Sequence, residues 1–208
     1  MKLLICVPTF DGSIKSKTAE SLGNAVEYLH ERRFFNDEVV YRYPRGYDVA
    51  RARNFMVRWA IEEKADYVFM VDSDMVLPSD SLLNLIEDDV DVALGYAVRG
   101  TSDDGRTAIV KYGAADNSNT YTTGDFKALR DSGTNLVQVK YGGMACALIE
   151  MSVFGRIRKP WFYYQDNPDG SALSEDYWFC RQCSNARVKV HVDTRVGCGH
   201  IKERVLEA

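Results

Sequence analysis

Long apolar runs and an excess of positive charge are both missing from this sequence. No stretch reaches the roughly 18 to 20 apolar residues of a membrane span, and the first strand-like run, residues 3–7, is far too short for the core of a signal peptide. The chain has 26 basic and 30 acidic residues and a pI near 5.5. Such a charge balance disfavours nucleic acid and anionic lipid as partners. We therefore expect a soluble, cytoplasmic protein with no membrane span.

Cysteine is scarce and odd in number, and linkers and repeats are missing. Most of the five cysteines lie in apolar periodic segments, which is typical of reduced core thiols rather than of a disulfide framework. No internal repeat, low-complexity tract or Ser/Pro-rich linker divides the chain. A length of 208 residues suits one domain with a substantial core. The sequence thus predicts a single domain over residues 1–208.

The first half alternates strand and helix patterns. Apolar runs predict the strands, and apolar residues at helical spacing predict the helices between them. In chain order we expect a strand at 3–7, a helix at 17–31, a strand at 38–43, a helix at 49–63, a strand at 67–71, a helix at 79–87 and a strand at 90–94. This order indicates an α/β fold with a doubly wound, mostly parallel sheet.

The second half is less regular. Residues 100–133 are rich in Asp, Asn, Thr and Gly, and predict surface loops or a small hairpin with one strand at 107–112. A strand is expected at 135–141, and a tight glycine turn leads into another strand within 142–149. A helix at 174–186 and a last strand at 188–192 follow. The residues from 195 onward carry no clear pattern.

Two carboxylates, Asp72 and Asp74, follow directly on the apolar strand 67–71, with Ser73 between them. Ligands of open α/β sheets bind beyond the carboxyl ends of the strands, so a site is expected at this position. Adjacent carboxylates repel each other unless a positive charge neutralises them, and a divalent cation with oxygen ligands does so. The alternative is a solvated turn in which Asp72 or Ser73 caps the next helix.

Basic residues gather on the helix at 49–63. Arg51, Asn54 and Arg58 lie opposite its apolar face, with Arg53 beside them. Arginine forms bidentate bonds to phosphate oxygens, so such a cluster near a carboxylate site would suit a diphosphate. Ordinary solvated surface charge is the alternative.

The first strand ends in Pro8, Thr9 and Phe10. This segment lacks the glycine pattern of a P-loop or a dinucleotide fingerprint. An open turn there could instead present backbone groups and Phe10 to a nucleobase.

Two further groups of residues suggest chemistry near the C-terminus. If Ser174 is the N-cap of the last helix, Asp176 heads a stripe of apolar residues that faces the protein, where the helix dipole favours the ionised form of a general base. The alternative is that Glu175 and Asp176 are ordinary first-turn acids. His200 could be a structural residue, or a ligand of a cation such as manganese that accepts oxygen and nitrogen.

Together these segments resemble the GT-A glycosyltransferases, in particular the large inverting family 2. The matching pieces, in the family's order, are "ICVPTF", "ARN" at 52–54, the DXD motif "FMVDSDMVLP", the glycine-rich "YGGMACALIEMSVF" and the ED motif "SEDYWFC". The resemblance implies a single GT-A, Rossmann-like domain with a mostly parallel central sheet flanked by helices. Residues 1–99 would form the nucleotide-sugar-binding half and residues 100–208 the acceptor-side half.

The resemblance also implies an activity and residue roles. The chain would be a metal-dependent, hexosyltransferase-type enzyme that moves a sugar, with inversion, from a nucleoside-diphosphate sugar, UDP-sugar favoured, to a hydroxyl of a saccharide or other acceptor. Its cofactor would be Mn²⁺ or Mg²⁺. The implied roles are nucleotide binding by Pro8, Thr9, Phe10, Arg51, Arg53, Asn54, Asp72 and Ser73, metal binding by Asp72, Asp74 and His200, catalysis by Asp176 with Glu175 beside it, and acceptor-side positions at Gly142 and Gly143.

Several alternatives stay open from the sequence. The QXXRW motif of processive, membrane-embedded synthases is missing, and a DXD with a histidine ligand also occurs in retaining GT-A enzymes. The same fold could bind a nucleotide sugar without catalysis. Cys180, Cys183, Cys198 and His200 could instead form a Cys3His structural zinc site. A nucleotidyltransferase is disfavoured because its glycine-rich opening loop is missing.

Overall fold

The computed structural model describes residues 1–32, 38–101, 107–109, 112–114, 120–168 and 170–202. Within these ranges no helix combines the length and the apolar character needed to cross a membrane. Strands and helices alternate through the first half as the sequence predicts, apart from an additional two-residue strand at Met75–Val76. The strands are β1 (Lys2–Cys6), β2 (Glu38–Arg42), β3 (Tyr67–Val71), β4 (Met75–Val76), β5 (Val92–Thr101), β6 (Thr107–Ile109), β7 (Tyr112–Ala114), β8 (Thr120–Tyr121), β9 (Leu136–Tyr141), β10 (Cys146–Glu150), β11 (Gln165–Asp166), β12 (Ala172–Leu173) and β13 (Val190–His200). The helices are α1 (Ser16–Arg32), α2 (Val49–Glu62), α3 (Ser81–Glu87), α4 (Thr123–Asp131), α5 (Val153–Arg156) and α6 (Glu175–Asn185).

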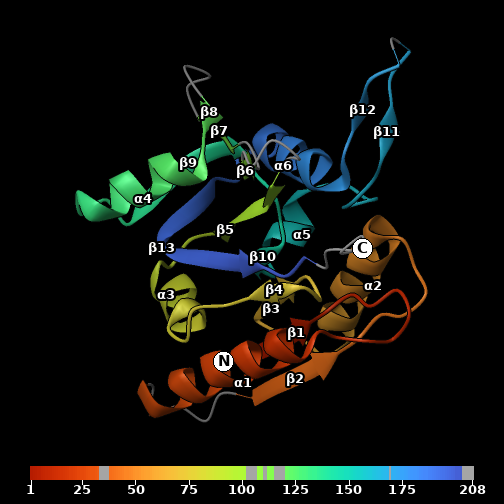
Figure 1. Cartoon of the computed structure of the whole chain (residues 1–208). Coiled ribbons are helices and arrows are strands. Elements are labelled where there is room, and N and C mark those ends of the chain that lie inside the picture. The colour runs from red at the N-terminus through yellow and green to blue at the C-terminus, as the bar shows by residue number, and fades with distance from the viewer. Residues whose placement is uncertain (33–37, 102–106, 110–111, 115–119, 169, 203–208) are drawn as a thin grey trace, which may run out of the picture.

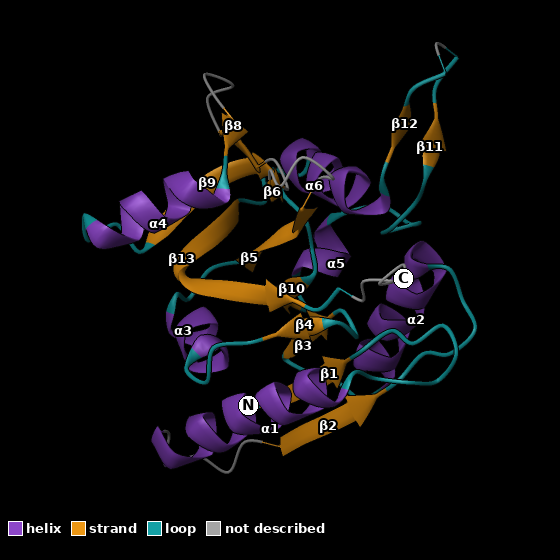
Figure 2. Cartoon of the chain, viewed as in Figure 1, coloured by secondary structure: helices purple, strands orange, loops and turns teal. Residues whose placement is uncertain are grey.

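The main sheet runs through the middle of the molecule, with helices on both sides (Figure 1; Figure 2). Its strand order is β2-β1-β3-β10-β5-β13-β9-β7-β8. Strands β2, β1, β3, β5 and β13 run in one direction, while β10 and β9 run the opposite way. The central part is therefore mostly parallel, which confirms the predicted fold class.

Successive side chains along each strand point to opposite faces of the sheet, so the core has two parts, one on each face. On β1, Leu3 and Ile5 pack with α1 and α3, whereas Leu4 and Cys6 pack with the cluster that includes α2, α4, α5 and α6. Each of these four side chains is fully buried. Because both faces are covered, the central strands are apolar throughout, which is why they read as continuous apolar runs in the sequence.

The second half contains elements that the sequence pattern does not predict. Helix α4 lies in the segment expected to form loops, and it begins with a capping box in which Thr122 and Asp125 satisfy each other's backbone N–H groups. The strand expected at 107–112 is divided into β6 and β7, and residues 110 and 111 lie outside the described ones. A hairpin of β11 and β12 projects from the body (Figure 1). Strand β13 is much longer than expected and ends at His200.

An ion cluster joins the end of α3 to β13, and it makes stability depend on pH. The Arg195 guanidinium contacts the Asp88 carboxylate at 2.7 Å and that of the fully buried Asp193 at 2.8 Å. Burial, and secondarily the Asp193 charge, raises the pKa of Asp88 to about 7. In the unfolded chain this pKa is about 4. The folded state therefore holds an extra proton between about pH 4 and pH 7, so the free energy of unfolding should fall as pH rises through that window.

We predict that Asp88→Asn removes this part of the pH dependence, because asparagine keeps an acceptor for Arg195 but does not titrate. Urea unfolding at pH 5.5 and pH 7.5 measures it: the wild type should lose more stability over this interval than the variant. The control is Asp89→Asn at the exposed neighbouring position. Equal slopes for the wild type and Asp88→Asn would refute the role of Asp88.

Candidate active site

A cavity of about 930 Å³ opens at the carboxyl ends of β1 and β3. The turns after these strands form one wall, the N-terminal ends of α2 and α6 form others, and the end of β13 closes it. Its lining residues are Pro8, Thr9, Phe10, Tyr47, Asp48, Val49, Arg53, Asp72, Ser73, Asp74, Met75, Ala97, Gly143, Met144, Ala145, Tyr164, Ser174, Glu175, Asp176, Tyr177 and His200. This is the crevice where open α/β sheets bind ligands.

Asp74 and His200 meet on one wall of this cavity. Strand β4 pairs with the end of β13, with Met75 opposite His200. Ile201 N–H donates to the carbonyl of Asp74 at 2.9 Å, which fixes the two segments together. As a result, Oδ2 of Asp74 lies 2.8 Å from Nε2 of His200. The tertiary fold therefore brings together two predicted metal ligands that are 126 positions apart in the sequence.

The donor set at this wall suits a divalent cation. Carboxylate oxygen and imidazole nitrogen together suit manganese. The 2.8 Å between the two donor atoms is close to the ~3 Å that separates adjacent ligands of an octahedral cation with bonds of about 2.1 Å. Among the described residues no group of three or more His, Cys, Asp or Glu side chains is arranged as a ready metal cluster. A cation here would thus take Asp74 and His200, and would need Asp72 or ligand oxygens to complete its coordination.

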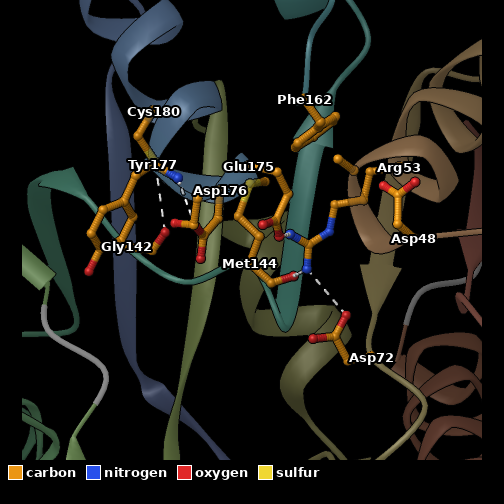
Figure 3. Close-up of polar contacts among 12 residues, drawn as sticks. Asp48, Arg53, Asp72, Gly142, Met144, Phe162, Glu175, Asp176, Tyr177 and Cys180 are labelled. Atoms are coloured by element: carbon orange, nitrogen blue, oxygen red, sulfur yellow. Dashed lines mark hydrogen bonds and ion pairs between the residues drawn. The ribbon is translucent and has the colours of Figure 1, made fainter. Parts of the chain in front are cut away.

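Arg53 is the buried centre of the site (Figure 3). Only 3% of the residue is exposed. Its guanidinium contacts the carboxylate of Glu175, donates to Oδ1 of Asp72 at 3.2 Å and donates to the Met144 carbonyl at 3.2 Å. Burial raises the pKa of both carboxyls, and the Arg53 charge opposes that rise. Arg53 thereby links α2, the turn after β3 and the start of α6.

Asp176 and Glu175 occupy different environments. Ser174 is the N-cap residue of α6, as expected. Glu175 is buried beside Arg53, whereas Asp176 is half-buried at the cavity wall. The Asp176 carboxylate accepts hydrogen bonds from the Ser174 hydroxyl and, at 2.8 Å, from the Tyr177 N–H.

The expected apolar stripe needs a correction. Glu175, rather than Asp176, is the acid on the fully buried side of α6, since Glu175, Phe179 and Cys183 follow at i, i+4 and i+8 and are all buried. Asp176 is turned toward the cavity, so one of its carboxylate oxygens remains available to a ligand beyond the two hydrogen bonds at Oδ1.

The other predicted site residues separate into two groups. Pro8, Thr9, Phe10, Ser73 and Gly143 line the cavity, and Phe10 is 81% exposed at its edge. The lining does not include Arg51, Asn54 or Gly142. Arg51 and Asn54 line a separate groove on α2, and the Gly142 carbonyl faces the Cys180 thiol at 3.8 Å.

The arginines of the 42–58 segment do not gather around the cavity. Arg53 is inside it, Arg42 on β2 pairs with Glu63, Arg45 is exposed in the loop before α2, and Arg51 and Arg58 line the groove on α2. Helical geometry separates Arg53 from Arg51 and Arg58, because residues on different faces of α2 cannot reach one ligand.

The cavity residues that were not among the predicted site residues include an acid and three tyrosines: Asp48, Tyr47, Tyr164 and Tyr177. Asp48 carried a signal, since an acid before an amphipathic helix is a typical N-cap, and its side chain does accept from Arg51 N–H at 2.9 Å. The Tyr164 hydroxyl lies within hydrogen-bonding reach of Glu175. No local pattern marks the three tyrosines.

The Cys3His zinc site is not formed. Cys180 and Cys183 pack in the core on the α6 side of the sheet, whereas Cys198 packs on the opposite side with α1 and α3. Zinc needs thiolates that converge on one point. The structural zinc-site alternative is therefore excluded.

Comparisons with known proteins bear on the fold. No protein-family model and no curated protein matches the sequence. Among solved structures, A197 from STIV is 18% identical, and the match covers 98% of this chain and 87% of that one with a TM-score of 0.58. The structure of GalNAc-T7 with UDP, GalNAc and Mn²⁺ is 13% identical and matches 96% of this chain with a TM-score of 0.59, but this covers only 44% of the GalNAc-T7 chain.

A third similar structure is the catalytic domain of Drosophila β1,4-galactosyltransferase 7 in complex with xylobiose. It is 14% identical, with 98% of this chain and 71% of that chain covered and a TM-score of 0.53. Together with the mixed α/β sheet, these likenesses show that the chain has the fold of the GT-A glycosyltransferases. At such identities they establish the fold and leave the activity to be argued from the site.

Proposed function

We propose that this GT-A-fold chain is a divalent-cation-dependent glycosyltransferase that uses a nucleoside-diphosphate sugar, with a UDP-sugar favoured. One observation carries the proposal: the same cavity has Asp74 paired with His200 on one wall and Asp176 on another. The first pair would hold the cation that a diphosphate needs. Asp176 would stand on the acceptor side as a general base.

The charge of the cavity supports a need for metal. Asp48, Asp72, Asp74, Glu175 and Asp176 line it. The arginine in the lining is Arg53, and it already contacts two of these carboxylates. A diphosphate brought into such surroundings would be repelled unless a cation accompanied it.

The other lining residues fit a nucleotide donor. Pro8, Thr9 and Phe10 would contact the base and ribose, with Phe10 as an exposed ring at the edge. Asp72 would accept from the ribose or from a water molecule on the cation, and Arg53 would hold Asp72 in place. A divalent cation held by Asp74 and His200, with Asp72 nearby, would neutralise charge on the leaving diphosphate. GalNAc-T7 was solved with UDP and Mn²⁺, which agrees with this assignment.

The reaction is a displacement at the anomeric carbon. The bond from that carbon to the diphosphate oxygen breaks, a bond to the acceptor oxygen forms, and Asp176 takes the proton of the acceptor hydroxyl. A single in-line step inverts the anomeric configuration. The hydrogen bonds from Ser174 and the Tyr177 N–H hold one carboxylate oxygen of Asp176 and leave the other for the acceptor. Gly143, which has no side chain and lines the cavity, would leave room for the acceptor.

A thermal-shift screen tests the donor half of the proposal. UDP, GDP, CDP and dTDP are each added with and without Mn²⁺ to the wild type and to Asp74→Ala. A ligand present at about 100 times its dissociation constant stabilises the folded state by about 2.7 kcal/mol, so a clear rise in melting temperature is expected for one nucleotide, with metal only. Asp74→Ala should lose this rise, because the cation loses its carboxylate ligand.

The matched control is Asp131→Ala at the exposed end of α4, which should keep the full rise. Metal-independent stabilisation that survives in Asp74→Ala would argue against the cation site. If a nucleotide binds with metal but incubation with its sugar conjugates yields neither transfer nor hydrolysis, the chain is a nucleotide-sugar-binding protein without catalysis.

A further inference from the structure

A second hollow, which we name the basic groove, lies along α2 outside the candidate active site. Its volume is about 430 Å³. One side is the exposed face of α2 and the other is the segment that follows α5. Its lining residues are Arg51, Asn54, Phe55, Arg58, Lys159, Pro160 and Trp161. Arg51 and Asn54 were expected to bind nucleotide, but neither lines the cavity in which the donor is proposed to bind.

The charge of the basic groove is opposite to that of the whole protein. The chain carries a net charge of −4, yet the lining contains Arg51, Arg58 and Lys159 and no acid. The ion pairs formed among the described residues involve none of these three cations. Like charges held together in a hollow without counter-ions create a local positive potential that attracts an anion.

The aromatic rings in the groove are already covered by the cations. The Arg58 guanidinium lies 5.2 Å from the centre of the Phe55 ring, and Lys159 Nζ lies 4.8 Å from that of Trp161. Trp161 is also buried. Binding of single-stranded nucleic acid relies on free ring faces on which bases stack. The groove thus offers positive charge without open rings, which favours a non-aromatic anion.

The groove is held in shape by Asn54. Its amide nitrogen donates to the carbonyls of Ala50 and Phe162 at 2.8 and 2.7 Å, and its amide oxygen accepts from Trp161 N–H at 3.2 Å. These bonds tie the two sides of the groove together. A pre-formed site avoids part of the ordering cost of binding.

The basic groove and the active-site cavity share a wall. Tyr47 lines the cavity, and its ring packs against the ring of Phe55 in the groove, with 4.6 Å between the two ring centroids. The segment after α5 contributes Lys159 to the groove and, five positions later, Tyr164 to the cavity. An extended ligand with one end in the cavity could therefore reach the groove with another part.

We propose that the basic groove binds the anionic groups of a negatively charged saccharide acceptor, a carboxylate or sulfate carried on sugar units adjoining the one that is modified. This inference rests on the proposed glycosyltransferase function and names its acceptor class. Arg51 and Arg58 would each form bidentate hydrogen bonds to one of these anionic groups, and Lys159 would add a third charge. The groove selects the acceptor by charge, while Asp176 acts on the hydroxyl at the far end.

Calorimetric titration of the full chain, without donor, tests the proposal. The probes are hexagalacturonate, its neutral methyl ester, a sulfated chondroitin hexasaccharide, inorganic sulfate and a twelve-residue oligothymidylate. At least one acidic hexasaccharide should bind ten times more tightly than the methyl ester or sulfate, and more weakly as salt rises. Arg58→Gln/Lys159→Gln should weaken that binding about tenfold or more. The control Lys17→Gln/Lys127→Gln removes the same charge from exposed positions on α1 and α4 and should change it less than twofold.

Each other outcome overturns the proposal. Equal binding of the methyl ester, no binding of either acidic hexasaccharide, equal affinity for inorganic sulfate, tighter binding of oligothymidylate, or an unchanged affinity in Arg58→Gln/Lys159→Gln would each do so. The stabilisation by UDP and Mn²⁺ is measured on the same proteins. If that stabilisation is present and the hexasaccharides do not bind, the acceptor inference alone fails; if they bind and no nucleotide does, the donor assignment fails instead.

Discussion

Replacing Asp176 by Asn should reduce the transfer rate by about 100- to 10,000-fold, the usual contribution of a general base. Asparagine keeps the oxygen that accepts from Ser174 and the Tyr177 N–H, so the start of α6 should stay intact. It cannot take a proton from the acceptor. The affinity for nucleotide and metal should therefore remain close to that of the wild type, and the loss should fall on kcat. Steady-state kinetics with the donor found in the thermal-shift screen, together with nucleotide titration, measures both.

The control for this variant is Asp131→Asn, which makes the same chemical change at an exposed carboxylate on α4. It should transfer at the wild-type rate. Full activity of Asp176→Asn would refute the assignment of the base. A loss of nucleotide affinity equal to the loss of rate would indicate that Asp176 binds the donor instead.

Replacing Arg53 by Met should lower the free energy of unfolding at pH 7 by about 3 to 5 kcal/mol, because it leaves the Glu175 and Asp72 carboxylates without their counter-charge. Glu175 is the more buried of the two. Without Arg53, burial and the charges of neighbouring carboxylates raise the pKa of both carboxyls further. In acid these carboxyls become protonated, which removes part of the cost of burying their charge. The difference in free energy of unfolding between the wild type and Arg53→Met should therefore shrink as the pH is lowered from 7 to 5. Urea unfolding at both pH values measures this change.

Two companion variants make the Arg53 prediction specific. Arg51→Met removes an exposed arginine two positions earlier on α2 and should change stability by no more than about 0.5 kcal/mol. Arg53→Met/Glu175→Gln should recover part of the loss, because the neutral amide costs less to bury than an unpaired carboxylate. A loss below about 1 kcal/mol for Arg53→Met would show that the contacts of Arg53 do not hold the three elements together.

The sequence by itself determined the order of the main elements in the first half and the place of the two carboxylates Asp72 and Asp74. Apolar runs such as 67–71 report burial on both faces, and the helix at 49–63 shows its period over four turns. Both signals are local, since they depend on neighbours within a few residues. The position of Asp72 and Asp74 directly after a buried strand was enough to expect a site, because such crevices follow from the topology of the sheet.

Only the tertiary structure decided how the acids and arginines are used. Asp74 meets His200 because β4 pairs with the end of β13, a contact between distant segments that leaves no periodic trace. Glu175 is buried and Asp176 is not, because Arg53 on α2 lies where it can pair with Glu175. The sequence of α6 alone does not show which of these two adjacent acids meets a positive charge. The arginines of α2 likewise divide between two sites: Arg53 enters the cavity, whereas Arg51 and Arg58 line the basic groove, since a helix turns neighbouring side chains to different faces. Local pattern fixes which elements form and roughly where they end, whereas partners of buried charges depend on packing between elements far apart in the chain.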